Sequence, residues 1–324
     1  MSTQASSADW CQHLSQKALA SSWRFKCEDI QIEKELCRTL KSNVHLGRWK
    51  GAQVVVKTLL AANSESSEEP RDASPASVAE ELLHEIDVLS SIRHPDLVLF
   101  LGACLDTSCS IACITEYMPG GDLESFYVAK RAKRQAPVWH PHLQQVVSWA
   151  AATARGLLFL HTREVPLVHR DLKPMNLLLT KHLDLKIADL GISRVLAAGT
   201  RDHSRYAMTG GVGTFRYMAP EVARGHYYDE KVDIYAFALI LYFMCSGQQP
   251  FHHLGQDPEF VLQLYTQGED PRPLLTDCPW KLRGLLAAAW AEETQKRPDA
   301  GQILAALENL EEEQAQPACG CSLM

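Results

Sequence analysis

The sequence predicts an α+β fold in which a small antiparallel β-sheet with one helix precedes a larger, mainly helical part. Two patterns lead to this prediction. Short β-rich runs separated by turns fill the early part of the chain, and longer apolar helical patterns fill the second half. The chain has 324 residues, of which 46% are hydrophobic and 22% charged, as in an ordinary globular protein with ample length for a core.

Composition and the chain ends exclude several classes of protein. The net charge of −7 argues against nucleic acid as the main partner. No apolar run approaches the roughly 20 residues of a membrane-spanning helix, the N-terminus lacks a basic-then-apolar signal, and Ser2 replaces the glycine that myristoylation requires. Ten cysteines are scattered through apolar segments, which favours reduced thiols in a cytosolic protein.

The predicted sheet begins at Ile30. Residues 1–29 mix Ser, Gln and Ala with the aromatics Trp10, Trp23 and Phe25. A short helix that docks on the body is one interpretation, and a flanking extension is the favoured one. Three β-rich runs then follow, with a turn at residues 50–51 between the second and the third, which indicates a β-meander.

A polar, acidic and proline-containing segment interrupts the sheet at about residues 61–77, and we expect a disordered loop there. A tolerated insertion is favoured over a regulatory phosphorylated loop. Leu82, Ile86 and Leu89 then recur at helical spacing, and the apolar runs 97–104 and 111–117 predict the last strands of the sheet.

The second half is predicted to be mainly helical. One long helix carries Val146, Ala150 and Leu157 on a single face and ends near residue 161. A polar segment covers 193–208, and a strongly apolar helix covers 231–247.

The most informative segment is residues 168–177, which reads Val-His-Arg-Asp-Leu-Lys-Pro-Met-Asn-Leu. It places an acid, two cations and an amide on one short stretch between apolar runs, which suggests a loop held rigidly by core elements. A second acid, Asp189, follows in the sequence Ile-Ala-Asp-Leu-Gly at a strand end. Two carboxylates and an amide suit a divalent metal and a hydroxyl nucleophile.

Residues 168–177 resemble the catalytic loop of a protein kinase, and residues 189–191 resemble that family's Asp-Phe-Gly, with Leu190 for Phe. The resemblance implies the two-lobed protein kinase fold. The kinase domain would cover 30–312, with an N-lobe at 30–118 and a C-lobe at 119–312, and residues 313–324 would form a tail.

The resemblance implies roles in phosphoryl transfer from ATP. Asp171 would orient and deprotonate the substrate hydroxyl, and Lys173 would neutralise charge on the γ-phosphate. Asn176 and Asp189 would hold Mg²⁺. A surface salt bridge or loop cap is the alternative for each residue alone, but their joint order makes that alternative weak.

Further kinase positions follow by resemblance in the N-lobe. Lys57, at the end of Val-Val-Val-Lys, would anchor the α- and β-phosphates and pair with Glu85. Thr115 falls at the gatekeeper position behind the adenine, and backbone groups of Glu116 and Met118 would bond the adenine edge.

The phosphate-binding hairpin departs from the family pattern. Its three glycine positions fall on Cys37, Thr39 and Ser42, while Val44 is in register. Side chains there are expected to stiffen the hairpin and lift it from the phosphates, although the hydroxyls of Thr39 and Ser42 can donate to phosphate. Val55 replaces a smaller alanine and can crowd the adenine. These departures favour the alternative of a pseudokinase that acts as a scaffold or allosteric partner.

The substrate class is also implied by resemblance. Lys173 and Thr214, which we include among the catalytic residues, are of the serine/threonine type. The segments 92–95, 99–104 and 217–221 are most similar to the tyrosine-kinase-like group, which includes the Raf and mixed-lineage kinases. The expected function is therefore phosphorylation of Ser or Thr in protein substrates during intracellular signalling. A small-molecule kinase is a third interpretation, weakened by the complete segment that ends in Ala-Pro-Glu.

Two further family features lie late in the chain. Asp233 begins the helix that corresponds to the family's central helix, and Arg297 matches the arginine that pairs with Glu221. Arg170 would bind an activation-segment phosphate placed by an upstream kinase, with Thr209 as the first candidate site and Ser204 as the second.

The last four residues, Cys-Ser-Leu-Met, match a prenylation box at Cys321, and Cys319 is a candidate for palmitoylation. A tail that ends in cysteine by chance is the alternative. We expect a cytoplasmic protein whose contact with a membrane, at its cytoplasmic face, would depend on these lipids.

Overall fold

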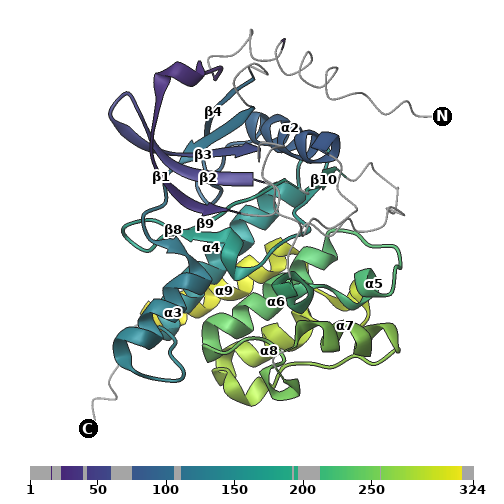
Figure 1. Ribbon diagram of the computed structural model, residues 1–324. Helices are drawn as coiled ribbons and strands as arrows, with labels where there is room; N and C mark the ends of the chain where they lie inside the picture. The colour runs from purple at the N-terminus through teal and green to yellow at the C-terminus, as the bar shows by residue number, and fades with distance from the viewer. Residues whose placement is uncertain are drawn as a thin grey trace, which may run out of the picture. The chain divides into compact units, whose positions relative to one another are not determined.

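The computed structural model describes residues 16, 23–38, 42–59, 75–105, 111–191, 193–195, 212–255 and 257–315. They belong to two compact units (Figure 1). The sheet unit comprises Met1–Met118 and Asp189–Ile192, and the helical unit comprises Pro119–Ala188 and Ser193–Met324. The predicted α+β fold, with one helix beside an antiparallel sheet and a mainly helical second part, is confirmed.

The described residues of the sheet unit form a sheet of five antiparallel strands in the order β1-β2-β3-β5-β4. Lys50 and Gly51 join β2 to β3, and both have positive φ, as two-residue hairpin turns favour. The last two strands are shorter than the apolar runs that predicted them. The strands are β1 (Ile30–Arg38), β2 (Ser42–Trp49), β3 (Ala52–Leu59), β4 (Phe100–Cys104) and β5 (Ala112–Glu116).

Helix α2 (Pro75–Ser91) belongs to the sheet unit. It buries Leu82, Ile86 and Leu89, the face that the sequence predicted. The helix begins at Pro75, so the prediction of a disordered loop to residue 77 was wrong for its last three residues. Proline is tolerated in a first helical turn because its missing N–H has no intrahelical partner there. Residues 60–74 lie outside the described part of the chain.

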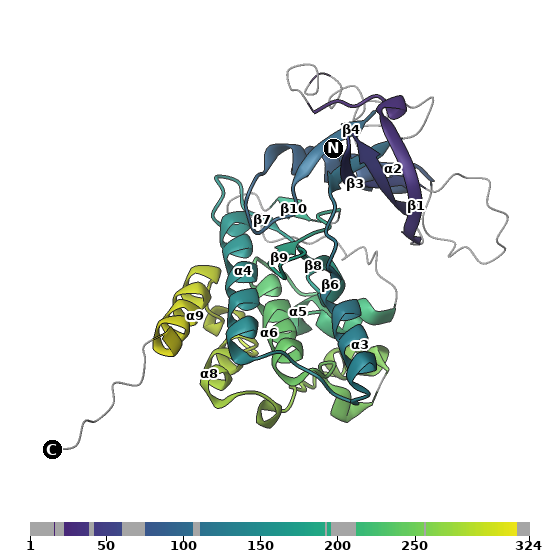
Figure 2. The ribbon, with the colours of Figure 1, turned by 90° about the vertical axis from the view of Figure 1, so that its left-hand side faces the viewer.

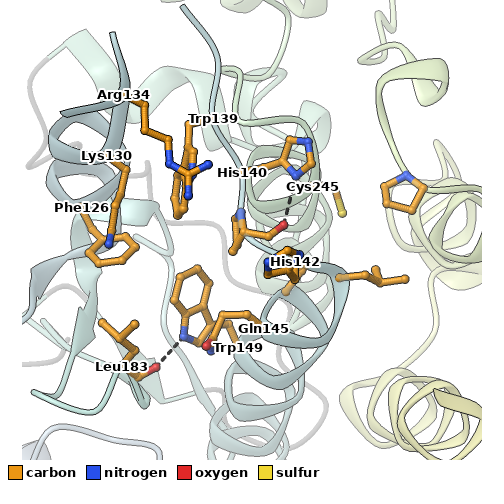
Figure 3. Close-up of a pocket in the computed structure, with 14 residues that line it drawn as sticks. Phe126, Lys130, Arg134, Trp139, His140, His142, Gln145, Trp149, Leu183 and Cys245 are labelled. Carbon is orange, nitrogen blue, oxygen red and sulfur yellow. Dashed lines mark hydrogen bonds between the residues drawn. The ribbon is translucent and has the colours of Figure 1, made fainter. Parts of the chain in front are cut away.

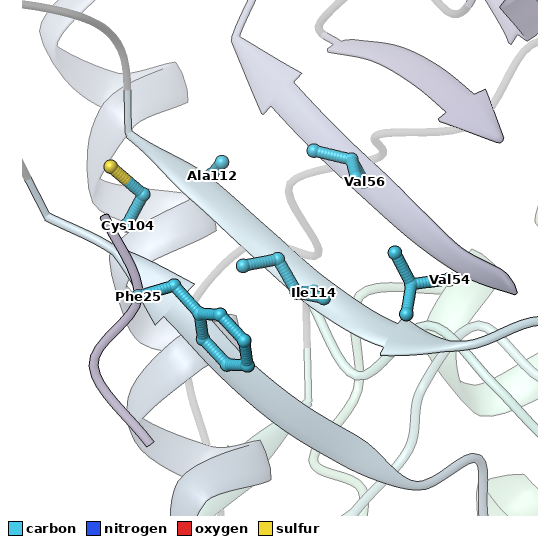
Figure 4. Packing of buried hydrophobic residues seen from close by; sticks show 6 residues of the cluster. All are labelled: Phe25, Val54, Val56, Cys104, Ala112 and Ile114. Carbon is cyan, nitrogen blue, oxygen red and sulfur yellow. The ribbon is translucent and has the colours of Figure 1, made fainter. Parts of the chain in front are cut away.

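The segment that precedes β1 packs as part of the sheet unit. The N–H of Phe25 donates to the carbonyl of Ala103 (2.9 Å), and the N–H of Ala103 donates to that of Trp23 (3.0 Å). Phe25 joins a core cluster with Val54 and Ile114 (Figure 4). A Cβ on Gly102 would lie 2.0 Å from the Phe25 ring, so only glycine fits there. Residues 23–29 are therefore more than a flanking extension.

A disulfide links Cys27, in the turn before β1, to Cys104 at the end of β4. The expectation of reduced thiols was wrong for these two cysteines. Their sequence separation of 77 residues gives no local signal. The pairing of residues 23–25 beside β4 brings the two Cα atoms to 6.0 Å, within the usual range for a disulfide.

The helical unit is organised around α6 (Lys231–Ser246), in which every residue from Val232 to Ser246 is buried. Helix α9 lies alongside α4, as Figure 2 shows. The predicted helical second half is confirmed. The other helices are α3 (Leu123–Arg134), α4 (Leu143–His161), α5 (Pro220–Ala223), α7 (Pro258–Thr266), α8 (Trp280–Ala289) and α9 (Ala300–Ala315).

Short strands surround the polar loop of the helical unit. Strands β6, β8 and β9 form one small sheet, and β7 pairs with β10 in another. These strands are β6 (Gly121–Asp122), β7 (Leu167–Val168), β8 (Leu177–Leu179), β9 (Leu185–Ile187) and β10 (Arg194–Val195).

A buried ion pair fixes the later part of this unit. Both terminal nitrogens of Arg297 donate to the Glu221 carboxylate, at 2.6 and 2.9 Å, so the pair expected from the sequence is present. This bidentate geometry is among the strongest charge-assisted arrangements. Within the described ranges, no helix has the length and apolar character needed to cross a membrane.

Candidate functional site

The sheet unit holds a cluster of one cation and two carboxylates. Lys57 lies on β3, and its Nζ donates to Glu85 Oε2 on α2 at 2.7 Å. The same Nζ donates to Asp189 Oδ1 at 3.1 Å. Three residues from distant parts of the sequence thus share one network, and the pairing of Lys57 with Glu85 that the sequence indicated is present.

The charges of this cluster reinforce one another. Burial by itself lowers the pKa of Lys57, but the carboxylates of Asp189 and Glu85 outweigh it, and the net pKa is raised. Lys57 is therefore a permanent cation. Cys113 lies opposite Lys57 on β5, where burial, with the charge of Glu85, raises the pKa of its thiol. This thiol stays protonated and is no nucleophile.

The backbone around Asp189 is unusual. Asp189 has φ +60°, in the left-handed region that costs most residues energy. A Cβ on Gly191 would lie 3.2 Å from Asp189 Oδ1 and 3.5 Å from Glu85 Oε2. Glycine thus lets the chain turn closely around the two carboxylates, which explains the Asp-Leu-Gly order.

The hairpin predicted to cover phosphate is described only in part. Cys37 is exposed on β1 and pairs with Val44, which in turn pairs with Lys57 on β3. Ser42 is buried at the start of β2, whereas Thr39 lies outside the described residues. Strand β1 has a register shift between Glu35 and Cys37. Bulges of this kind bend a strand locally.

The candidate adenine-binding residues lie on and after β5. Val55 on β3 pairs with Thr115 on β5. Glu116 is fixed by two bonds to Leu99: its N–H donates to the Leu99 carbonyl at 3.0 Å, and its Oε1 accepts from the Leu99 N–H at 2.7 Å. Met118 is buried. The N–H and the side chain of Glu116 are thus both bonded within the protein.

The helical unit holds a second polar cluster, in the loop after β7. Asp171 Oδ2 accepts from Lys173 Nζ at 2.7 Å and from Asn176 Nδ2 at 3.2 Å. Asn176 Nδ2 also donates to the Asp171 carbonyl at 2.7 Å. The other carboxylate oxygen, Asp171 Oδ1, is buried without a hydrogen-bond partner among the described residues. Such an atom needs a donor, and a substrate hydroxyl can supply one.

Asp233, at the start of α6, anchors this loop. Its Oδ2 accepts from the His169 N–H at 2.8 Å and lies 2.8 Å from His161 Nε2, while its Oδ1 accepts from the Arg170 N–H at 2.9 Å. These bonds hold Arg170 at φ +71°, a strained conformation for a non-glycine residue. The sequence placed Asp233 on the right helix but gave no sign of this anchoring.

The charge of Asp233 is maintained by its partners. Burial alone raises its pKa, but the hydrogen bond and charge of His161, with the nearby His169 and the Arg170 N–H, outweigh it and lower the net pKa. Asp233 therefore remains an acceptor for both backbone N–H groups over the physiological pH range.

The buried ring of His169 holds the loop by two hydrogen bonds. Its Nδ1 accepts from the Asp171 N–H at 3.2 Å, so its Nε2 carries the proton and donates to the Ala188 carbonyl at 3.0 Å. His169 is fully buried. It is a positioning residue, because its ring bonds the backbone at Asp171 and at Ala188, the residue before Asp189.

Mg²⁺ fits the residue types present. The side-chain hydrogen bonds described for Asn176 use Nδ2, which leaves its side-chain amide oxygen for a cation, and Asp189 supplies a carboxylate. Among the described residues, no group of three His, Cys, Asp or Glu side chains forms a metal cage. Mg²⁺ typically binds through one or two such side chains together with phosphate and water, so the absence of a cage is compatible with it.

Several candidate residues lie outside the described part of the chain. They are Thr39, Ser204, Thr209, Cys319 and Cys321. Thr214 lies in the 3₁₀ helix Val212–Tyr217, whose backbone alone is described at that position. The roles given to these residues stay predictions.

Known proteins resemble this chain over most of its length. The serine/threonine-protein kinase VIK of Arabidopsis thaliana is 35% identical over 266 residues, which are 82% of this chain and 56% of that protein. The probable serine/threonine-protein kinase drkB of Dictyostelium discoideum is 32% identical, over 88% of this chain and 37% of that protein. The dual specificity protein kinase pyk3 of the same organism is 29% identical, over 88% of this chain and 19% of that protein.

The chain thus spans about half or less of the length of these relatives. Residues 30–307 match the family described as protein tyrosine and serine/threonine kinase, and this range contains both polar clusters. The kinase resemblance of the sequence is therefore confirmed: the chain belongs to the protein tyrosine and serine/threonine kinase family.

Proposed function

We propose that this protein is an ATP- and Mg²⁺-dependent protein kinase that transfers the γ-phosphate to Ser or Thr hydroxyls of protein substrates in intracellular signalling. The observation that carries the proposal is Asp171 Oδ1, a buried carboxylate oxygen that has no hydrogen-bond partner among the described residues and lies on a loop held by Asp233 and His169. The kinase families of the similar proteins support it.

Asp171 would act on the substrate hydroxyl. Its Oδ2 is already held by Lys173 and Asn176, so Oδ1 is the atom that would accept the hydroxyl hydrogen bond and then its proton. Lys173 Nζ pairs with Asp171 Oδ2, and from there its ammonium would stabilise negative charge on the transferred group.

Lys57 would bind the α- and β-phosphates of ATP while Glu85 keeps its ammonium in place. Backbone groups of Glu116 and Met118 would bond the adenine, behind which Thr115 would lie. Asn176 and Asp189 would hold Mg²⁺, which, when bound, neutralises phosphate charge and orients the phosphates.

A pseudokinase is the second candidate function. The side chains at Cys37, Thr39 and Ser42 favour it, because they replace glycines that let backbone amides approach phosphate. Lys57, Glu85, Asp171, Asn176 and Asp189 oppose it, because a chain without catalytic activity has no need of all five.

A phosphotransfer assay distinguishes the two. Purified protein is incubated with Mg²⁺, γ-labelled ATP and a generic basic protein, and phosphoamino acids are identified. The wild type is expected to label Ser or Thr, and Asp171→Asn to lose about 10²–10⁴-fold in rate. Asp184→Asn is the matched control, because Asp184 is exposed in the turn before β9 and its described hydrogen bonds are with Thr180. Equal transfer by Asp171→Asn, or none by the wild type, would contradict the proposal.

The regulatory features remain predictions. Phosphorylation at Thr209 or Ser204 by an upstream kinase, and lipids at Cys321 and Cys319 that would attach a cytoplasmic protein to the cytoplasmic face of a membrane, follow from sequence patterns. Mass spectrometry of protein from its native cells tests for the phosphates and for the lipids. An intact Met324 would contradict prenylation.

A further inference from the structure

The helical unit contains a cavity of about 470 Å³ lined by none of the residues assigned to phosphoryl transfer. Its walls come from α3, the loop to α4, the first turns of α4 and the turn between β8 and β9, with contributions beside α6 and α8 (Figure 3). This volume lies within the range of small-molecule pockets, roughly 300–1,000 Å³.

Three aromatic rings form the apolar part of the cavity. The Phe126 ring lies edge-to-face with Trp139 and with Trp149, at centroid distances of 5.8 and 5.9 Å. The Trp149 Nε1–H donates to the Leu183 carbonyl at 2.7 Å, so its polar end is satisfied within the wall. An aromatic guest would find ring faces and edges here for offset or edge-to-face contact.

Two cations from α3 flank the same rings. Lys130 Nζ lies 4.9 Å from the Phe126 centroid and 5.9 Å from that of Trp139, and Arg134 Cζ lies 5.9 Å from Trp139. No carboxylate of the described residues lies within ion-pair distance of either cation. Arg134 lies in the last turn of α3, where the helix dipole favours a cation, and this interaction leaves its side-chain N–H groups available for an anion.

The loop that carries Trp139 is held in place by the fold. Helix α3 ends at Arg134, and the next residue, Gln135, has the left-handed conformation. The Ala136 N–H donates to the Arg131 carbonyl at 3.2 Å. A Cβ on Gly247 would lie only 2.1 Å from the Trp139 carbonyl oxygen, so a glycine at φ +69° allows the loop to pack there. The cavity is therefore preformed, which limits the entropy cost of binding.

We propose that this cavity binds a small planar aromatic carboxylate. Its ring would contact Phe126, Trp139 and Trp149, and its carboxylate would meet Lys130 and Arg134. The chain as a whole is acidic, so this cationic rim is a local feature that selects an anion. Three ring walls favour a planar aromatic body over an alkyl chain.

The test is calorimetric titration of the full chain with naphthalene-2-carboxylate and with naphthalene-2-methanol, its neutral analogue of nearly equal shape. One molecule of the acid is expected to bind per chain, and the alcohol to bind about tenfold more weakly, because it lacks charge-assisted hydrogen bonds. Equal affinity for acid and alcohol, or no binding of the acid, would overturn the proposal. Decanoate binding more tightly than the acid would overturn it as well.

Two variants locate the site. Arg134→Gln is expected to weaken the acid about tenfold and leave the alcohol unchanged, a difference that misfolding would not produce. Trp139→Phe is expected to weaken both ligands. Trp280→Ala is the matched control, since Trp280 is 75% exposed with Lys281 Nζ 5.8 Å from its ring but lines no part of this cavity.

Loss of binding in Trp280→Ala, or unchanged binding of the acid in Arg134→Gln, contradicts the assignment. If an acidic peptide such as acetyl-Glu-Phe-Glu bound the chain and naphthalene-2-carboxylate did not, the proposal of a small-molecule ligand would be wrong and a protein partner would take its place. Since phosphoryl transfer plays no part in these titrations, their outcome is independent of the proposed kinase activity.

Discussion

The two polar clusters are built in different ways. The cluster in the sheet unit is a network of charged side chains, in which Lys57 meets carboxylates 28 and 132 residues away in sequence. The cluster in the helical unit is held by backbone hydrogen bonds, because Asp233 accepts from two consecutive N–H groups of its loop. The first therefore depends on where α2 and residues 189–191 lie, whereas the second is fixed by a buried anchor.

The difference predicts a division of labour. A network of side chains can exchange partners, so Lys57 can turn from Asp189 to a phosphate while Glu85 stays with it. A loop held by its backbone keeps the Asp171 carboxylate in a fixed position, as its proposed role of catalytic base requires. We expect changes in the first cluster to act mainly on ATP binding, and changes in the second to act on transfer itself.

The largest expected effect concerns the sheet that carries Lys57. Phe25→Ala removes a buried ring from the core cluster and should lower the free energy of unfolding by about 3–5 kcal/mol. Hydrogen exchange should show the loss in β3 and β5 and leave α6 protected. Val128→Ala, a truncation of an exposed apolar side chain, serves as the control. A loss spread evenly over both units would show that the sheet does not depend specifically on residues 23–25.

Asp233→Asn should have the next largest effect and lower the free energy of unfolding by about 3 kcal/mol. The substitution replaces a buried, charged hydrogen-bond acceptor by a neutral one. The pKa of Asp233 is lowered in the folded state, so its contribution is present above the unfolded pKa of about 3.9 and disappears as the pH falls through the lowered value.

Urea denaturation at a series of pH values measures this dependence. The difference between wild type and Asp233→Asn should be constant near neutral pH and shrink in acid. A difference that grew as the pH fell would mean that the anchor is not a carboxylate with a lowered pKa.

Glu85→Gln should have a smaller effect, expressed in activity. Without the Glu85 charge, Lys57 is held less firmly, and kcat/KM for ATP should fall about tenfold, or about 1.4 kcal/mol. Glu33→Gln is the matched control, because Glu33 forms an exposed ion pair with Arg48 on the same sheet. Exposed pairs contribute roughly 0–1 kcal/mol, so this control should leave both stability and activity nearly unchanged. Equal effects of the two substitutions would contradict a special role for Glu85.

The sequence predicted those features that lie within short motifs. The order of Lys57, Glu85, Asp171, Asn176 and Asp189 was sufficient to propose both clusters, because each residue stands in a recognisable local pattern. The β-meander and the apolar face of α2 also followed from periodicity.

Features made by contacts between distant segments were not predictable. Cys27 and Cys104 meet because residues 23–25 run beside β4, and nothing in the local sequence of either cysteine indicates this pairing. The two backbone bonds of Asp233 and the aromatic cavity at Trp139 have the same origin, since both arise when α6 packs against a loop from elsewhere in the chain.

The division of labour is tested most directly by measuring γ-phosphate transfer at increasing ATP concentration for wild type, Glu85→Gln and Asp171→Asn. Saturating ATP is expected to return Glu85→Gln to near the wild-type rate and to leave Asp171→Asn slow by about 10²–10⁴-fold. Failure of ATP to rescue Glu85→Gln, or rescue of Asp171→Asn, would contradict the assignment of ATP binding to one cluster and transfer to the other.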